Sequence, residues 1–358
     1  MSEQRSLPIN AFEGPACPLP LIHNEQIVMG HGSGGRMTHE LVSKVFQAYL
    51  ASPELAAGDD FASLLLAPGE RMAVSTDSHI VKPLFFPGGD IGRLAVCGTV
   101  NDVAMAGATP RYLTAGFILE EGLPMETLQR VLASMQAAAL EAGVRFVAGD
   151  TKVVERGKAD GIFITTTGFG TIPMDREIHG ALAKPGDVVL VSGTMGDHGI
   201  AVLAARGELG FETGVQSDVA PLNGMISDLL LAAPHTHVLR DPTRGGLATT
   251  LNEIAVQSKV CIQLDEKAIP VSPAVQAACE MLGFDPLYVA NEGKVIVIVP
   301  QDEAHAALAS LLAHPHGRGA ARIGEVKSTP INRVLLRTLI GGTRIVDTLA
   351  GEILPRIC

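Results

Sequence analysis

The chain has 358 residues, of which 47% are hydrophobic, and a formal net charge of -11 at pH 7. This length and hydrophobicity allow a large buried core, which excludes an intrinsically disordered chain and fits two domains better than one. The negative charge and the lack of any Lys/Arg-rich run argue against nucleic acid as a partner, because such binding depends on cationic contacts to phosphates.

The N-terminal region lacks the pattern of a targeting or membrane segment. No basic stretch followed by a long apolar run occurs there, and no run of about 18 apolar residues follows downstream. We therefore expect a soluble, cytoplasmic protein with no membrane contact. Residues 1–30 are rich in Pro and polar residues, which predicts a flexible arm with an ordered start near Ile27.

From residue 31 onwards two kinds of pattern alternate. Strand-like runs such as RMAVST, RYLTAGFIL, VRFVAG and GIFITTTGFG are separated by helical patterns at DIGRLAVCGTVNDVAMAGA and METLQRVLASMQAAALEA. A turn-rich break, TIPMDREIHGALAKPGD, precedes a second series that begins at DVVLVSG. The sequence therefore predicts an α/β (α+β) fold with domains at residues 31–175 and 176–345, followed by a mobile tail at residues 346–358.

A glycine-rich segment, HGSGGR, stands just before a helical pattern. Gly34 and Gly35 let backbone N–H groups crowd around an anion, so we expect them to contact a nucleotide; the alternative is a plain turn into the helix. The chain has neither a P-loop nor a dinucleotide-binding fingerprint. Phosphate must therefore be held in another way.

Four aspartates stand where an apolar strand or helix meets a turn: Asp60, Asp77, Asp102 and Asp150. Carboxylates that lie together repel one another unless a divalent cation neutralises them, and hard oxygen ligands favour magnesium that carries a polyphosphate. We therefore expect these four residues to hold Mg²⁺ and ATP, with Asn101 beside them in an otherwise apolar helical stretch. The alternative for each aspartate taken alone is a helix cap or a turn.

Lys152 follows Asp150 by two positions. If Thr151 continues the strand, the side chains on either side of it point to the same face, which would place the ammonium group beside metal-bound phosphates. There it could stabilise the charge of a transferred phosphoryl group. Thr151 and Lys152 therefore join the predicted nucleotide site.

In the second half, SGTMGDHGIAV, RDPTRGGLATTLNEIA and VANEGKVIVIV each place charged groups beside glycines, as loops that face a shared cleft do. Asp197 and Asp241 are expected to cap helices. Glu292 follows the strand-like YVA and has no obvious capping role. It is therefore the best lone acid in this half.

Five cysteines lie far apart with no C-x-x-C pair, so the sequence signals neither a zinc knuckle nor a disulfide framework. Cys97 and Cys261 sit in apolar runs and are expected to fill the core. Cys358 ends the predicted tail and cannot be a core filler, which makes it a candidate for chemistry; the alternative is an incidental exposed thiol.

These segments resemble one known family. HGSGGR, STDSHIVKPLFFPGGDIGRLAVCGTVNDVAMAGATPRYL, GFILEEGLP, GDTKVVERG, RDPTRGGLATTLNEIA, VANEGKV and the final PRIC are similar to the HypE family of hydrogenase maturation proteins, the carbamoyl dehydratases. The similarity runs from about His31 to Cys358. PRIC is its most specific part, because the related aminoimidazole ribonucleotide synthetases, thiamine-phosphate kinases and selenophosphate synthetases lack it. The first thirty residues are longer than the family leads us to expect.

The resemblance implies a two-domain aminoimidazole ribonucleotide synthetase-like fold and a homodimer formed through the N-terminal sheet. It also implies that the carbamoyltransferase HypF carbamoylates the Cys358 thiol. The thiocarbamate is then dehydrated to a thiocyanate while ATP gives ADP and phosphate, and the cyanide passes to iron held by a complex of HypC and HypD for [NiFe]-hydrogenase maturation.

The residues fit this chemistry as the resemblance assigns it. The carbamoyl oxygen is a poor leaving group, so the γ-phosphoryl group is first transferred to it, with Mg²⁺ held by the aspartates and Lys152 offsetting charge. Loss of the N–H protons then needs a base, for which Glu292 and Lys152 are the family's candidates. The tail must carry Cys358 inwards, and its tethering gives a high effective concentration.

Two other functions are alternatives. A selenophosphate synthetase keeps its reactive Cys or selenocysteine near the N-terminus, where this chain offers only Cys17. A nucleotide-gated scaffold or metallochaperone would use Cys358 as a soft metal ligand, although this thiol has no His or Cys close to it in the sequence.

Overall fold

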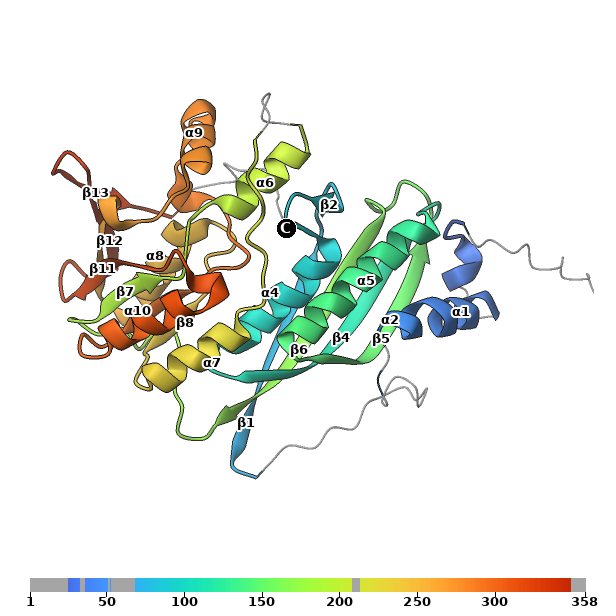
Figure 1. Cartoon of the computed structure of the whole chain (residues 1–358), viewed down its shortest axis with the longest axis horizontal. Coiled ribbons are helices and arrows are strands. Elements are labelled where there is room, and N and C mark those ends of the chain that lie inside the picture. The colour runs from blue at the N-terminus through green and yellow to red at the C-terminus, as the bar shows by residue number, and fades with distance from the viewer. Residues whose placement is uncertain (1–24, 33–35, 51, 53–67, 208–212, 349–358) are drawn as a thin grey trace, which may run out of the picture.

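The computed structural model describes residues 25–32, 36–50, 52, 68–207 and 213–348. Two β-sheets with their helices lie side by side along the long axis of the molecule (Figure 1). Several residues singled out above lie outside the described part of the chain: Cys17, Gly34, Gly35, Asp60 and Cys358. The same holds for most of the predicted arm and tail.

The N-terminal sheet has four strands, in the spatial order β1 (Glu70–His79), β6 (Ile162–Pro173), β4 (Thr109–Glu120) and β5 (Arg145–Val154). Strands β4 and β5 run parallel, and the other neighbours are antiparallel. Along β6, buried residues alternate with more accessible ones. Such alternation is typical of a sheet covered on one face only.

Helices α4 (Ile91–Met105) and α5 (Met125–Ala142) cover that face (Figure 1). Helix α4 starts at this point because the Asp90 carboxylate accepts the backbone N–H groups of Gly92 and Arg93. The two-stranded ribbon of β2 (Phe85–Phe86) and β3 (Gly89–Asp90) leads into it. We call the uncovered face of this sheet the open face.

The first described residues pack at the far edge of this layer. Ile27 is fully buried, and its N–H donates to the Leu123 carbonyl at 2.7 Å, which agrees with an ordered start near Ile27. Short helical turns follow, in the order η1 (Met29–Gly32), α1 (Arg36–Leu41), η2 (Val42–Phe46) and α2 (Gln47–Leu50).

The C-terminal sheet has seven strands, in the spatial order β13 (Thr343–Val346), β12 (Arg333–Arg337), β9 (Cys261–Asp265), β11 (Ala321–Lys327), β7 (Val188–Val191), β10 (Ile296–Val299) and β8 (Val238–Arg240). Strand β7 reads VVLV, and each of its residues is buried. Helices cover both faces: Val188 and Leu190 share a core with α7 (Asn223–Ala232) and α10 (Ala304–Ala313). Val189 and Val191 share a core with α8 (Gly246–Ser258).

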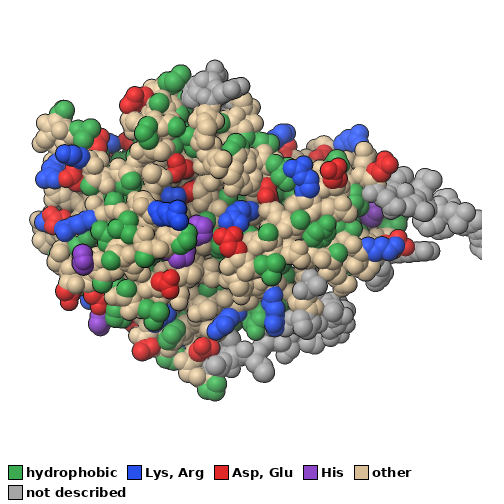
Figure 2. All heavy atoms as spheres, in the orientation of Figure 1, with side chains coloured by type: hydrophobic (Ala, Val, Ile, Leu, Met, Phe, Trp, Pro, Cys, Tyr) green, Lys and Arg blue, Asp and Glu red, His purple; other side chains and the backbone are tan. Residues whose placement is uncertain are grey.

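Helices α6 (Asp197–Ala205) and α9 (Pro273–Leu282) form a smaller core with each other at one end of this half. Short 3₁₀ turns occur at η3 (Glu266–Ala268), η4 (Pro286–Tyr288) and η5 (Pro315–Gly317). No helix in the described ranges is long and apolar enough to cross a membrane. Figure 2 shows Lys and Arg side chains interspersed with Asp and Glu side chains over the visible face.

The two halves meet along α4. Ala104 and Met105 at its C-terminal end belong to the same core as Val188 and Leu190 of β7. The boundary expected near residue 175 would fall in the connection between β6 and β7. Cys97 and Cys261 are buried, as predicted for core residues.

Candidate functional site

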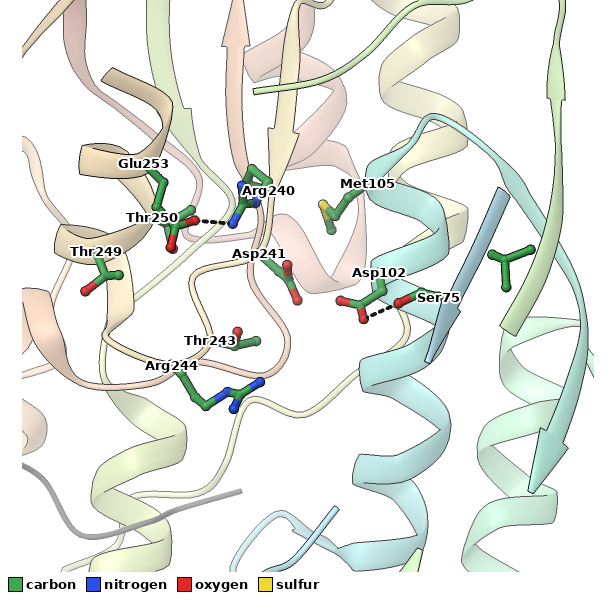
Figure 3. Close-up of a pocket in the computed structure, with 11 residues that line it drawn as sticks. Ser75, Asp102, Met105, Arg240, Asp241, Thr243, Arg244, Thr249, Thr250 and Glu253 are labelled. Atoms are coloured by element: carbon green, nitrogen blue, oxygen red, sulfur yellow. Dashed lines mark hydrogen bonds and ion pairs between the residues drawn. The ribbon is translucent and has the colours of Figure 1, made fainter. Parts of the chain in front are cut away.

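A cavity lies where β1 and α4 face the loop that precedes α8. Its inner part encloses about 150 Å³ and is lined by Thr76, Asp77, Ser78, His79, Gly98, Asp102, Asp241, Thr243, Arg244 and Glu292. An outer chamber of about 670 Å³ shares Asp102, Asp241, Thr243 and Arg244 with it. Figure 3 shows Asp102 and Asp241 approaching each other from α4 and from the loop after β8.

The β1 and α4 side of the cavity is fixed by regular structure. Asp77 lies on β1 opposite Thr166, whose side chain is buried beneath α4, so Asp77 points to the covered face. Gly98 and Asp102 are four residues apart on α4 and therefore lie on one side of the helix. Asp102 Oδ2 accepts a hydrogen bond of 2.7 Å from the Ser75 hydroxyl.

Burial and mutual repulsion raise the pKa values of three acids in the cavity, Asp102, Asp241 and Glu292. Burial raises the pKa of Asp102, the Ser75 hydrogen bond opposes this, and the charge of Asp77 adds to it. Burial, followed by the charge of Asp102, raises the pKa of Asp241 to about 7. Burial, followed by the charge of Asp241, raises the pKa of Glu292 well above its ordinary value. A cation in this cavity would relieve these costs.

Glu292 lies just before β10 and is 6% exposed. Within the described residues, no hydrogen bond reaches its carboxylate oxygens. A methyl group built on Gly98 would lie 4.0 Å from Glu292 Oε2, 3.8 Å from Asp77 Oδ2 and 3.2 Å from His79 Cε1. Gly98 therefore keeps open the space between these groups, which a ligand could enter.

His79 is a buried residue of the cavity lining. Its ring is 2% exposed, and Nε2 lies 3.3 Å from Thr166 Oγ1 and 3.9 Å from Asp77 Oδ2. Burial lowers the pKa of His79, and the charge of Asp77 opposes this effect. On the loop side, Arg244 lines both parts of the cavity. Carboxylates on both walls and a guanidinium on the loop side suit a phosphate group bound together with a divalent cation.

Of the four expected metal-binding aspartates, the structure brings together Asp77 and Asp102. Asp150 lies on β5 in register with Gly116, Thr165 and Ser78 across the sheet. Directly opposed residues share a face, so Asp150 points to the open face, away from Asp77. The expectation of one cluster containing Asp150 is therefore wrong within a single chain.

Across the described ranges, no three His, Cys, Asp or Glu side chains are placed to hold a metal ion by themselves. Magnesium in nucleotide sites commonly takes one or two carboxylates and completes its shell with phosphate and water. Asp77 and Asp102 with a nucleotide would meet that need.

Lys152 and Asp150 share a face, as predicted. Lys152 Nζ lies 2.9 Å from Asp150 Oδ2, and the two side chains are 67% and 70% exposed on the open face. Thr151 points the other way, and its buried Oγ1 has no hydrogen-bond partner among the described residues. The expected place of Lys152 beside the other phosphate-binding residues is therefore not formed within one chain.

Asn101 was expected to contact the nucleotide, but it does not line the cavity. It is 1% exposed, and its amide nitrogen donates to the carbonyls of Ala220 at 3.0 Å and Glu292 at 3.3 Å. Its Oδ1 accepts from Leu222 N at 2.8 Å. Asn101 therefore joins the two halves of the chain.

The capping roles expected for Asp197 and Asp241 are wrong. Helix α6 has Gly196 at its N-cap, and the Asp197 carboxylate instead accepts hydrogen bonds from the hydroxyls of Thr194 and Ser272. Helix α8 has Gly245 at its N-cap, which leaves Asp241 in the cavity. The available signal for Asp241 was its place in RDPTRGG, a charged, glycine-containing loop between a strand and a helix.

Comparison with known proteins gives consistent matches. The model of the AIR synthase related protein N-terminal domain matches residues 58–172, and that of the C-terminal domain matches residues 184–337. Carbamoyl dehydratase HypE of Cupriavidus necator is 56% identical over 337 residues, which cover 94% of this chain and 96% of that relative.

Solved structures agree with these matches. A crystal structure of hydrogenase maturation protein HypE in complex with ATP has a TM-score of 0.89 and 53% identity, and the match covers 92% of this chain and 99% of that one. A HypE–HypF complex has a TM-score of 0.76 and 50% identity, covering 86% of this chain and 99% of that one. The two-domain α/β fold expected from the sequence is therefore confirmed.

Proposed function

Because this chain belongs to the HypE family of carbamoyl dehydratases, we propose that it uses ATP to dehydrate a carbamoyl group on Cys358 to a thiocyanate. HypF supplies the carbamoyl group, and the HypC–HypD complex receives the cyanide for the iron of [NiFe]-hydrogenase in the cytoplasm. The relatives solved with ATP and with HypF support the nucleotide and the first partner. The observation that carries the proposal is the buried Glu292 carboxylate, which faces Asp77 across the space that Gly98 keeps open.

Mg-ATP fits the residues of the cavity. Asp77 and Asp102 offer the hard oxygen ligands that magnesium prefers, and Asp241 stands beside them with a pKa raised to about 7. Bound magnesium supplies charge neutralisation for these acids and for the phosphates. Arg244, which lines the same space, is placed to receive phosphate oxygens. Gly34, Gly35 and Asp60 stay predicted nucleotide or metal contacts and lie outside the described residues.

The chemistry divides into two stages. The carbamoyl oxygen takes the γ-phosphoryl group from ATP, and ADP is released. In the second stage the carbamoyl oxygen leaves the carbon as part of the phosphate. The carbamoyl nitrogen loses both of its protons as the C≡N bond forms, so a base must stand near it. Glu292 is proposed for this role, because a carboxyl group whose pKa is raised by burial accepts a proton more readily than an exposed one.

A homodimer through the open face completes the proposal. Met72, Val74 and Ile118 are 52%, 53% and 41% exposed on this face, an unusual position for large apolar side chains. A second copy that covers them would bring Asp150 and Lys152 to the interface. Lys152 is therefore proposed to act on the phosphates of the nucleotide site across the dimer. The Thr151 side chain is buried and points away from this interface, so no contact with the nucleotide is proposed for it.

The proposed function is tested by Glu292→Gln, which keeps the shape of the side chain but cannot accept the proton. Carbamoylation by HypF and ATP binding should be unchanged, while thiocyanate formation slows by about a hundredfold or more. Intact-mass measurements would then show the carbamoylated protein accumulating. A normal rate of water loss in this variant would remove Glu292 from the mechanism.

A further inference from the structure

Both backbone polar atoms of Glu292 are held by side chains, one from each half of the molecule. Its N–H donates to Asp218 Oδ1 at 3.1 Å, and its carbonyl accepts from Asn101 Nδ2 at 3.3 Å. The next residue, Gly293, passes so close to Asp218 that an added methyl group would lie 1.8 Å from the Asp218 carbonyl oxygen. The main chain at Glu292 is therefore fixed on both sides.

Asp218 is itself fixed by a buried ion pair. Lys294 Nζ lies 3.0 Å from Asp218 Oδ2, and the two side chains are 10% and 4% exposed. The stem of Lys294 packs on Gly193, where a methyl group would lie 2.8 Å from Lys294 Cε. Buried ion pairs are a poor source of stability, because their desolvation offsets most of their attraction. This pair lies beside Glu292, where it fixes the carboxylate that accepts the Glu292 N–H.

Asn101 ties this segment to the other wall of the cavity. Its amide also bonds the backbone of Ala220 and Leu222, just after Asp218 in the chain. Asn101 lies on α4, the helix that carries Gly98 and Asp102. The backbone of Glu292 is thus hydrogen-bonded both to the helix that lines the cavity and to a residue of the C-terminal half.

We propose that Asn101, Asp218 and Lys294 are positioning residues that form a clamp on the Glu292 main chain and so set where its carboxylate stands in the cavity. This inference rests on the proposed role of Glu292 as the base. Asp218 acts through the Glu292 N–H, Lys294 acts through Asp218, and Asn101 acts through the Glu292 carbonyl. Loss of the clamp therefore impairs the proton-transfer stage and spares carbamoylation and ATP binding.

The test uses full-length protein that HypF has carbamoylated, mixed with saturating Mg-ATP in a single turnover. Asp218→Ala should slow water loss by about tenfold to a hundredfold, the usual effect of a displacement near 1 Å in a catalytic group. Its dissociation constant for ATP should stay within about threefold of wild type, since the clamp does not line the cavity. A normal rate of water loss in a folded Asp218→Ala variant overturns the clamp.

The chain offers a matched control for the loss of a buried acid. Asp187 is also buried, and its carboxylate accepts from a backbone N–H, that of Lys184 at 2.7 Å, and from His237 Nδ1 at 2.8 Å. It does not line the cavity. Asp187→Ala should lower stability while leaving the rate of water loss unchanged. An equal slowing in both variants would show a general effect of destabilisation and would overturn the clamp.

A second variant keeps the test decisive if Asp218→Ala does not fold. Asp218→Asn combined with Lys294→Gln replaces the ion pair by two amides and keeps an acceptor for the Glu292 N–H. We expect this double variant to dehydrate faster than Lys294→Met alone, which leaves the Asp218 charge unpaired. The reverse order would contradict the clamp. Failure of wild-type protein to lose water would instead contradict the proposed function and leave the backbone contacts as purely structural.

Discussion

Gly98 of α4 faces the carboxylate of Asp77 on β1, and a methyl group on Gly98 would lie 3.8 Å from Asp77 Oδ2. Gly98→Ala should therefore have opposite effects on stability and on binding. Alanine favours a helix interior over glycine by about 1 kcal/mol, so the free energy of unfolding should stay the same or rise. The tight contact of the new methyl group with His79 Cε1, at 3.2 Å, offsets part of this gain. The affinity for Mg-ATP should fall by about tenfold, or 1.4 kcal/mol, because the added methyl group occupies the cavity.

Chemical denaturation and titration calorimetry would measure both effects. Asp77→Asn is the comparison variant, since it removes a proposed metal ligand without adding volume and should reduce the dependence of ATP binding on magnesium. If Gly98→Ala binds Mg-ATP as tightly as wild type, the nucleotide does not occupy this cavity.

The stability of the ligand-free protein should depend on pH through Asp241. Its folded-state pKa is about 7, against an ordinary value of 3.8, so the folded state binds more protons than the unfolded state between these values. The free energy of unfolding should therefore fall as the pH rises through this window. Asp241→Asn should raise the free energy of unfolding more at pH 8 than at pH 5 in urea titrations.

Asp160→Asn is the control for this pH dependence. Asp160 is 53% exposed and pairs with Lys82 at the surface, where ion pairs contribute little. Its removal should leave the pH dependence of stability unchanged. If the stability of Asp241→Asn has the same pH dependence as that of wild type, burial among the other acids does not raise the pKa of Asp241.

Part of this site could be predicted from the sequence. Asp77 and Asp102 were expected in the site from local patterns, since one lies in a strand and the other in an apolar helix. The face of Asp150 could not be predicted, because it depends on register across three strand pairs. Two of these pairs contain a shift, one between Leu113 and Thr114 and the other between Pro110 and Tyr112. A shift of one residue turns a side chain to the other face.

The fold-level expectation of alternating strands and helices in two series was correct, because hydrophobic periodicity is a local property. The role of Asp241 could not be predicted in the same way. Its burial arises from contact between the loop after β8 and helix α4, which are far apart in sequence. Asn101 was misassigned for a similar reason: its partners Ala220 and Glu292 are distant along the chain.

The open face of the N-terminal sheet should form the proposed dimer. Val74→Lys places a charge on this face, and the cost of burying it should shift the protein to monomer in sedimentation velocity. Leu231→Lys is the control, because Leu231 is 79% exposed on α7, away from the open face. Dimerisation that survives Val74→Lys but is lost in Leu231→Lys would place the interface elsewhere.

Cys358 is proposed to carry the reacting group. Wild-type protein incubated with HypF, carbamoyl phosphate and Mg-ATP should first gain the mass of one carbamoyl group and then lose the mass of one water. Peptide mapping should place both changes on Cys358. Cys358→Ala should bind ATP but show no mass change under the same conditions. Carbamoylation of the Cys358→Ala variant, on any other residue, would contradict the account.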